Sequence, residues 1–194
     1  GESWVFSAKA STVDVCPLAA YNWLKFTKEF GEAGDCVALI DLGASTTDIV
    51  IERDNQFRFT RSLNLGGNDV TAAVAAEFGM PWAQAEKLKR EKGFAPTGDA
   101  ARDGKGGEVI GRVLNRLVSE INRSFAYFRS QPGGGPVNRI IVTGGGACLR
   151  NMIPFLQRQL GQHEHGGPHG RPRGRGRGRR RRGRSPVRDQ LPPA

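Results

Sequence analysis

The sequence predicts an α/β domain that ends near residue 162 and is followed by a disordered tail. Three strand patterns, at 36–41, 47–53 and 57–63, succeed one another across two short turns, which favours two β-hairpins in a row. The longest helical pattern, at 108–129, repeats its apolar residues at spacings of three and four. From 163 onwards the chain is mostly Gly, Arg, Pro and His, and such a composition cannot bury a core.

The segment that precedes the first hairpin predicts one short strand and one helix. The strand is expected at 12–15, and the helix from Pro17 to about residue 30, because proline is tolerated in the first turn of a helix. The apolar face of this helix is expected to consist of Leu18, Ala19, Trp23, Leu24 and Phe26.

The strand at 36–41 is apolar until its last residue, so we expect it to be buried. Tight turns at 42–46 and 54–55 connect it to the two strands that follow. Since each turn reverses the chain, we expect antiparallel pairing at this edge of the sheet.

Two helices and an exposed loop are expected next. Asp69 is placed to cap a helix that runs to residue 78, and Pro81 begins a second helix that ends at residue 92. The inward residues are expected to be Val70, Ala73, Val74 and Phe78 in the first helix and Trp82, Ala85 and Leu88 in the second. Because glycine and charged residues are frequent in 93–107, we expect an exposed loop there.

The long helix at 108–129 and a strand–turn–helix unit complete the domain. The inward stripe of the long helix is expected to be Ile110, Leu114, Leu117, Ile121, Phe125 and Phe128. A strand at 140–143, a glycine turn at 144–146 and a helix at 151–160 follow.

The formal net charge of +10 is concentrated in the tail, where 163–194 holds ten arginines and two acidic residues. The domain is therefore close to neutral, which argues against a basic nucleic-acid-binding domain. No apolar run approaches the roughly 20 residues of a membrane helix, and the sequence GESWVFSAKA does not resemble a signal peptide. Three widely spaced cysteines do not suit a disulfide framework or a zinc site, so we expect a reduced, cytoplasmic protein.

The first motif, DLGASTTD, begins at Asp41 and connects two strands. A carboxylate at the end of a buried strand can hold hydrated Mg²⁺, which keeps several of its waters. Gly43 lets the backbone approach a phosphate, and the hydroxyl and N–H groups of Ser45 and Thr46 can donate hydrogen bonds to it. An ordinary hairpin turn with a polar tip is the alternative.

Two further patterns suit a nucleotide. Gly144, Gly145 and Gly146 lie between a strand and a helix, where successive glycines permit close approach of a flat or anionic ligand. Glu86 and Lys89 lie three residues apart on one helix face, where they could bracket a ribose or a base. A plain connection and a surface ion pair are the respective alternatives.

Taken in order, these motifs resemble the second lobe of an actin-like ATPase, which has a ribonuclease H-like fold. The resemblance covers about 13–161 and is carried by VDVCPLAAYN, ALIDLGASTTDIVI, FTRSLNLGGNDVT, SEINRSFAYFRSQ and VNRIIVTGGGACLRNMIPFLQRQLG. Within this superfamily the sequence is most similar to the PilM family of type IV pilus assembly proteins, and the FtsA cell division family is the alternative. The resemblance implies a mixed sheet with flanking helices. It makes 1–35 the end of a first lobe with a connecting helix, and 36–162 the nucleotide-binding lobe.

The resemblance also implies ATP and Mg²⁺ as cofactors, with weak or absent ATPase activity and the nucleotide acting as a conformational switch. The residues that it assigns to the nucleotide are Gly43, Ala44, Ser45, Thr46, Glu86, Lys89, Gly144, Gly145 and Gly146, and the metal residue is Asp41. The first four would line the β- and γ-phosphates, and Glu86 and Lys89 would reach the ribose and the adenine. The three glycines would pack against the adenosine and the α-phosphate.

The implied partners are PilN-like pilus components, which would hold a cytoplasmic protein at the inner membrane. The first lobe, with its own Asp-x-Gly turn and the subdomain that grips PilN, has no counterpart here, so we expect an incomplete fragment. The abrupt change after Gly161 suggests a frameshift in a GC-rich gene as the origin of the tail. A rival from another class is an adaptor whose tail arginines bind RNA or acidic lipids without sequence preference. A sugar kinase is disfavoured because no general-base aspartate stands out.

Overall fold

A four-stranded mixed sheet organises the part of the chain that the computed structural model describes, residues 16–27 and 35–161. Its strands are β1 (Cys36–Leu42), β2 (Thr47–Arg53), β3 (Gln56–Leu63) and β4 (Arg139–Thr143), in the spatial order β3-β2-β1-β4. The strand expected at 12–15 and the tail at 163–194 lie outside the described residues.

The first three strands form the antiparallel meander that the two turns predicted. Asp54 and Asn55 both have positive φ, 57° and 58°, which is the geometry of a tight two-residue hairpin. β4 instead pairs parallel to β1, with Ile40 opposite Val142, and this pairing makes the sheet mixed.

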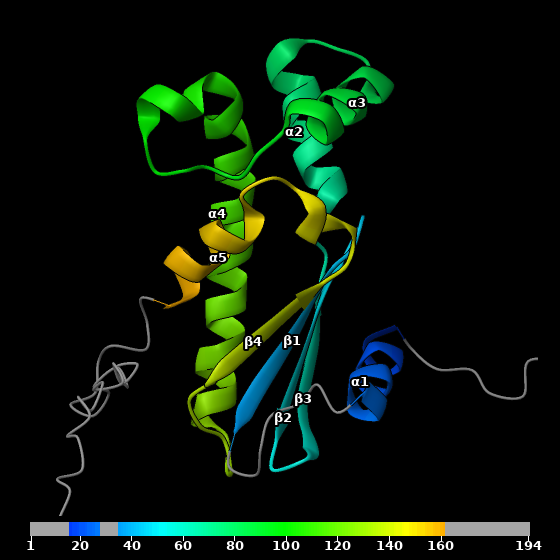
Figure 1. Cartoon of the computed structure of the whole chain (residues 1–194), viewed down its shortest axis with the longest axis vertical. Helices are drawn as coiled ribbons and strands as arrows, with labels where there is room; N and C mark the ends of the chain where they lie inside the picture. The colour runs from blue at the N-terminus through cyan, green and yellow to red at the C-terminus, as the bar shows by residue number, and fades with distance from the viewer. Residues whose placement is uncertain (1–15, 28–34, 162–194) are drawn as a thin grey trace, which may run out of the picture. The chain divides into compact units, whose positions relative to one another are not determined.

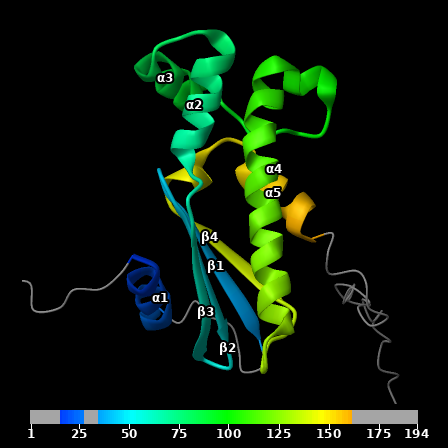
Figure 2. The same ribbon diagram turned by 180° about the vertical axis from the view of Figure 1, so that it is seen from behind.

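One face of the sheet carries the main core. Alternate residues of β1 and β2 point into it, among them Ala38, Ile40 and Ile49, each fully buried. The helices that cover this face are α4 (Ala100–Ser130) and α5 (Met152–Leu160), and residues of α2 (Gly67–Phe78) extend the core beyond the end of the sheet. α4 runs along the sheet in both views of Figures 1 and 2. The six apolar residues predicted for the long helix are all buried. Each such side chain stabilises the fold by about 1.5–3 kcal/mol.

The opposite face of the sheet packs against α1 (Cys16–Thr27), as Figure 1 shows. Among the side chains of α1 that the structure describes, Tyr21 is buried beside Val37, Leu39 and Val50. The expected apolar face of this helix is therefore wrong in part: Ala19 is exposed, and Phe26 is 86% exposed. Tyr21 faces the sheet, and its ring also contacts the edge strand, with its centroid 5.6 Å from that of the Phe57 ring. The side chains of Trp23 and Leu24 lie outside the described part.

Beyond the end of the sheet lie α2 and α3 (Trp82–Lys92), as Figure 1 shows. Because the α2–α3 connection points away from the sheet, Phe78 and Trp82 are 40% and 48% exposed, and their expected inward placement is wrong. Asp69 is not the N-cap of α2. Gly66 occupies that position, and the Asp69 carboxylate accepts a hydrogen bond of 2.8 Å from the Gly66 N–H.

The loop expected at 93–107 is shorter than predicted, because α4 already begins at Ala100. The Asp99 carboxylate caps the helix by accepting from the Ala101 N–H at 3.0 Å, and Gly104, with φ 53°, kinks it. Gly107 is buried, and a Cβ atom there would lie 2.8 Å from that of Asp103. The glycines that suggested a loop therefore serve a kink and a close packing contact.

Candidate functional site

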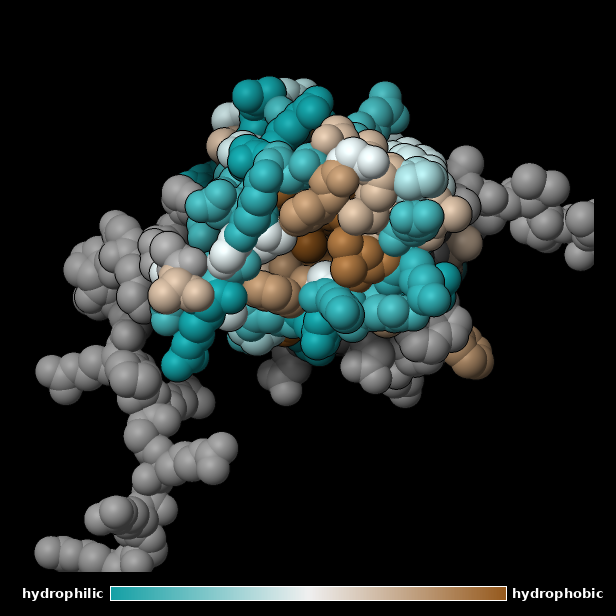
Figure 3. All heavy atoms as spheres, turned by 90° about the horizontal axis from the view of Figure 1, so that it is seen from above, coloured by the Kyte–Doolittle hydropathy of each residue, from teal (hydrophilic) through white to brown (hydrophobic). Residues whose placement is uncertain are grey.

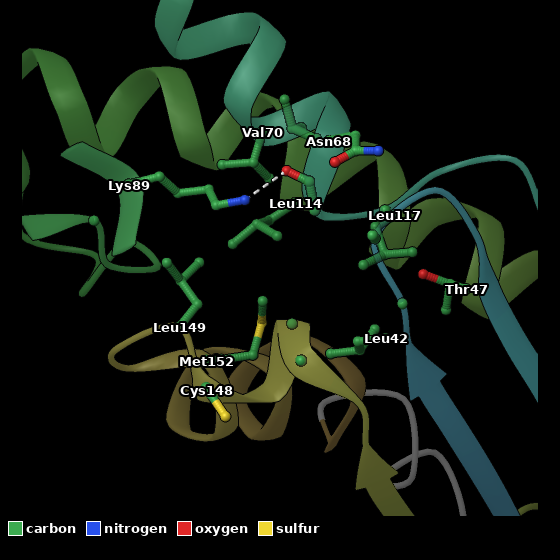
Figure 4. Close-up of a pocket in the computed structure, with 18 of the residues that line it drawn as sticks. Leu42, Thr47, Asn68, Val70, Lys89, Leu114, Leu117, Cys148, Leu149 and Met152 are labelled. Carbon is green, nitrogen blue, oxygen red and sulfur yellow. Dashed lines mark hydrogen bonds between the residues drawn. The ribbon is translucent and has the colours of Figure 1, made fainter. Parts of the chain in front are cut away.

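A cavity of about 400 Å³ lies between one end of the sheet and the helices that cover it. It is lined by the β1–β2 turn, the start of α2, one face of α3 and the middle of α4. The remaining wall is the short 3₁₀ helix η1 (Gly145–Cys148) with the start of α5. Figure 4 shows Lys89 and Val70 on one side of the open space and Leu149 and Met152 on the other.

The β1–β2 turn is held rigidly by its own backbone and by the start of α2. The Gly43 N–H donates to the Thr46 carbonyl at 2.9 Å, and the Gly67 N–H donates to the Gly43 carbonyl at 3.0 Å. The Asn68 N–H completes the attachment by donating to the carbonyl of Ala44 at 2.7 Å. The first turn of α2 is therefore fastened directly to the tip of the hairpin.

Glycine is required where the helix meets the turn. A Cβ atom on Gly66 would lie 2.6 Å from the Ala44 carbonyl oxygen, so any larger residue would separate the two segments. The positive end of the α2 dipole consequently lies beside the turn, which favours an anion there.

Lys89 of α3 is the central polar residue of the cavity. Its ammonium group lies 2.7 Å from a carboxylate oxygen of Glu86 and donates to the Gly67 carbonyl at 3.0 Å, the dashed line in Figure 4. It also donates to the Thr71 hydroxyl at 2.9 Å, and that hydroxyl donates to Glu86 at 2.5 Å. The pair thus connects α3 to the first turns of α2.

The Glu86 carboxyl is held in its ionised form. Partial burial acts to raise its pKa, but the hydrogen bonds from Lys89 and Thr71, with the charges of Lys89 and Arg90, outweigh the burial. Its pKa therefore lies below the ordinary value, and the carboxylate is available as a hydrogen-bond acceptor at neutral pH.

Gly145 and Gly146, directly after Gly144, contribute backbone to the opposite wall. Gly144 has φ 86°, and a Cβ atom there would lie 2.3 Å from a carboxylate oxygen of Asp41, so the strand end and the glycine turn touch. At Gly145, which is exposed, a Cβ atom would meet no atom within 4 Å. Gly145 therefore presents bare backbone to the cavity.

The structure brings together six of the residues that the sequence singled out. Those that line the cavity are Gly43, Ala44, Glu86, Lys89, Gly145 and Gly146. Ser45, Thr46 and Gly144 are adjacent to it in the chain without lining it, and the Ser45 hydroxyl accepts from the Asn68 amide at 3.1 Å.

Asp41 lies outside the cavity lining. It precedes Leu42, whose side chain lines the cavity, so Asp41 points to the other face of the strand. There it is opposite Asp48, whose carboxylate accepts a hydrogen bond from the Ser62 hydroxyl. Burial raises the pKa of Asp41, and the charge of Asp48 raises it further. Among residues 16–27 and 35–161, no group of three or more His, Cys, Asp or Glu side chains is arranged to hold a metal ion.

Sequence reasoning missed several residues of the site. Gly66, Gly67 and Asn68 line the cavity, and their signal was the glycine pair directly after a strand and before a helix. Arg90 and Arg150 also line it, and no local pattern marks either of them.

A second, smaller cavity of about 200 Å³ lies between α2, α3 and the N-terminal part of α4. Its lining includes Val74, Leu88 and Ile110. Figure 3, a view of this end of the molecule, shows apolar side chains in a hollow that polar side chains surround. In the described part of the chain, no helix is both long and apolar enough to cross a membrane.

Comparisons with known proteins agree with this architecture. The chain is 34% identical over 162 residues to the cell division protein FtsA of Escherichia coli (strain K12), a match that covers 72% of this chain and 38% of FtsA. A solved PilM-PilN type IV pilus biogenesis complex matches with a TM-score of 0.64 and 30% identity, over 78% of this chain and 40% of that one. Ta0583, an archaeal actin homolog, shares the fold with a TM-score of 0.50 and 22% identity, over 72% of this chain and 45% of its own.

The chain thus spans about two fifths of the length of the first two relatives. Residues 8–165 match the family described as type IV pilus assembly protein PilM. This match and the PilM-PilN structure confirm the predicted actin-like fold and favour the pilus family over the division family. The chain belongs to the PilM family of type IV pilus assembly proteins.

Proposed function

We propose that the larger cavity binds the adenosine part of ATP, and that the β1–β2 turn binds its phosphates. The observation that carries the proposal is the convergence of three distant segments on one cavity: the turn at Gly43, the Glu86–Lys89 pair and the backbone of Gly145. A volume of about 400 Å³ is within the usual range for small-molecule sites.

Each wall offers a different part of the nucleotide a suitable partner. The ionised Glu86 carboxylate can accept hydrogen bonds from ribose hydroxyls, and Lys89 holds that carboxylate in place at the cavity wall. The bare backbone at Gly145 and the apolar Leu149 and Met152 suit a flat base. The N-terminus of α2, beside the turn, favours the phosphates.

Mg²⁺ is part of the same proposal. Asp41 lies next to Asp48 across the strand pair, and burial together with the charge of Asp48 raises the pKa of Asp41; two neighbouring carboxylates of this kind suit a divalent cation held through water. Bound there, the ion would neutralise phosphate charge. We propose no catalytic residue, so the nucleotide would act mainly as a conformational switch with weak or no hydrolysis.

The proposed cellular role is that of a cytoplasmic scaffold in type IV pilus assembly, with a PilN-like partner that attaches it to the inner membrane. The support is the family match and the solved complex, in which a PilM relative is assembled with PilN. Co-purification of the chain with the PilN-like protein from the same cell tests this part. If the PilN-like protein co-purified neither with this chain nor with a full-length relative from the PilM family, the proposed partner would be wrong.

Calorimetric titration of Mg-ATP into the intact chain and its Gly145→Val variant tests the nucleotide site. Because a Cβ atom at Gly145 would meet no non-neighbouring atom of the described residues within 4 Å, we expect valine to fit the fold but to occupy space in the cavity, and affinity should fall at least tenfold. The matched control is Gly161→Val, at another glycine with open surroundings and negative φ outside the cavity lining. Equal affinities of the two variants would contradict the site.

A Mg²⁺ titration at fixed ATP tests the metal residue separately. Asp41→Asn should weaken the dependence of ATP affinity on Mg²⁺, and an unchanged dependence would remove Asp41 from the proposal.

A further inference from the structure

The segment that leaves α3 is bound to the segment that enters α5. The Ala95 N–H donates to the Arg150 carbonyl at 2.8 Å, and Phe94 and Arg150 form a parallel β-bridge. The Asn151 side-chain amide donates to the carbonyls of Ala95 and Pro96, at 2.8 and 3.1 Å. We call this set of contacts between 93–96 and 150–151 the strap.

Asn151 is suited to this role by its backbone as well as its side chain. It has φ 62°, a left-handed conformation that asparagine adopts more readily than most residues. With the backbone in this conformation, the Asn151 side-chain amide donates to the two successive carbonyls of Ala95 and Pro96. Ala95, between the bridge and this amide, is fully buried.

The strap is continuous with both walls of the larger cavity. On one side the Gly93 N–H donates to the Lys89 carbonyl at 2.9 Å, so the turn of α3 that carries Lys89 ends directly in the strap. On the other side Asn151 is followed by Met152, which lines the opposite wall with Gly145.

We propose that Asn151 is a positioning residue that sets the spacing between the Lys89 wall and the Gly145 wall. The inference rests on the proposed nucleotide site and adds a residue that does not itself line the cavity. Because the strap holds the two walls before any ligand arrives, the base end of the site is preorganised. The phosphates are assigned to the β1–β2 turn, so the strap acts on adenosine and ATP alike.

The test uses Asn151→Gly, which keeps the left-handed backbone and removes the amide. Adenosine and Mg-ATP should both bind about tenfold more weakly, as expected for two lost hydrogen bonds, and the ratio of their affinities should stay constant. In the ligand-free chain, amide hydrogen exchange at Ala95 should accelerate. Asn151→Asp, which replaces the donor by an acceptor facing two carbonyls, should weaken binding further.

The matched control is Asn138→Gly. Asn138 accepts a hydrogen bond from the Cys36 N–H at 3.0 Å, at the opposite end of β1, so its loss should lower Tm without changing either affinity. Unchanged Ala95 exchange in Asn151→Gly would refute the strap, whatever the ligand does. Faster exchange with unchanged affinities would refute the positioning role. If the unmodified chain binds neither adenosine nor Mg-ATP, the proposed function is wrong, and the positioning role of Asn151 is wrong with it. The hydrogen-exchange data would then still show whether the strap exists.

Discussion

Replacement of Lys89 by methionine should lower the free energy of unfolding by about 2–3 kcal/mol. The ammonium group has three partners, Glu86 at 2.7 Å, the Thr71 hydroxyl at 2.9 Å and the Gly67 carbonyl at 3.0 Å. The side chains of Lys89 and Glu86 are 14% and 33% exposed. The expected loss is therefore above the 0–1 kcal/mol of a surface pair and below the roughly 3–5 kcal/mol of a buried one.

Urea denaturation at pH 7 measures this loss, and a double-mutant cycle with Glu86→Gln isolates the pair. The coupling energy should be about 1–2 kcal/mol, since contacting charged residues are not additive. Lys87→Met is the control, because the ammonium of Lys87 lies 3.9 Å from Glu91 and the two side chains are 74% and 57% exposed. Lys87→Met should lower the free energy of unfolding by less than about 0.5 kcal/mol. Equal losses at the two lysines would refute the reasoning.

The same pair has a pH signature. The folded pKa of Glu86 lies below its unfolded value, so its ionisation stabilises the fold at pH values above the unfolded pKa, about 4.3. This stabilisation is lost as the pH falls through the lower, folded pKa. The stability difference between the wild type and Lys89→Met should therefore shrink below about pH 4. A difference that stayed constant down to pH 2 would show that packing, not charge, stabilises the contact.

Three further substitutions have distinct expected outcomes. Glu52→Gln should raise Tm at pH 7 but not near pH 4. Burial raises the pKa of Glu52, although the charge of Lys25 and a hydrogen bond with Tyr21 oppose this, so the charged form of Glu52 destabilises the fold at pH 7. In the described part of the chain its Oε2 has no hydrogen-bond donor, and thermal melts across this range check the sign. Ile121→Ala in α4 should cost about 2–5 kcal/mol in urea unfolding, since Ile121 is fully buried, and a loss below 1 kcal/mol would contradict this core. Gly79→Ala should cost about 1 kcal/mol, because Gly79 ends α2 with φ 59° in open space, and an unchanged Tm would contradict backbone strain as the cause.

Local patterns explain which elements the sequence could predict. The meander was predicted from apolar runs separated by tight turns, and the buried stripe of the long helix from its apolar residues at spacings of three and four. Both predictions use only residues that are close together in the sequence. The exposure of Phe78 and Trp82 could not be predicted, because both occupy apolar helix positions and only the three-dimensional structure shows that the segment joining their helices lies beyond the sheet. The start of α4 was missed because Gly104 and Gly107 resemble loop glycines until their kink and packing contacts are seen.

The candidate site was predictable as separate motifs but not as one surface. The pattern of Glu86 and Lys89 suits a solvent-exposed ion pair equally well, and the three-dimensional structure is needed to bring it beside Gly67. The role of Asn151 depends on carbonyls more than fifty residues away, and no periodicity in the sequence encodes such a contact. Asp41 was identified from its place at a strand end, but alternation along β1 directs it away from the cavity.

The parallel pairing of β1 with β4 has a consequence for the order in which the chain folds. The Cys36 N–H and the Asn138 side chain that accepts from it are 102 residues apart, whereas the hairpins of the meander are local. Hairpins form within microseconds, but a ribosome adds only about 5–20 residues per second. The 80 residues that separate the end of β3 at Leu63 from the end of β4 at Thr143 therefore take roughly 4–16 s to synthesise, and during this time the edge of β1 that pairs with β4 is open. During synthesis this open edge is a natural target for chaperones, and the larger cavity can assemble only near the end of translation of the domain, because residues 145–152 form one of its walls.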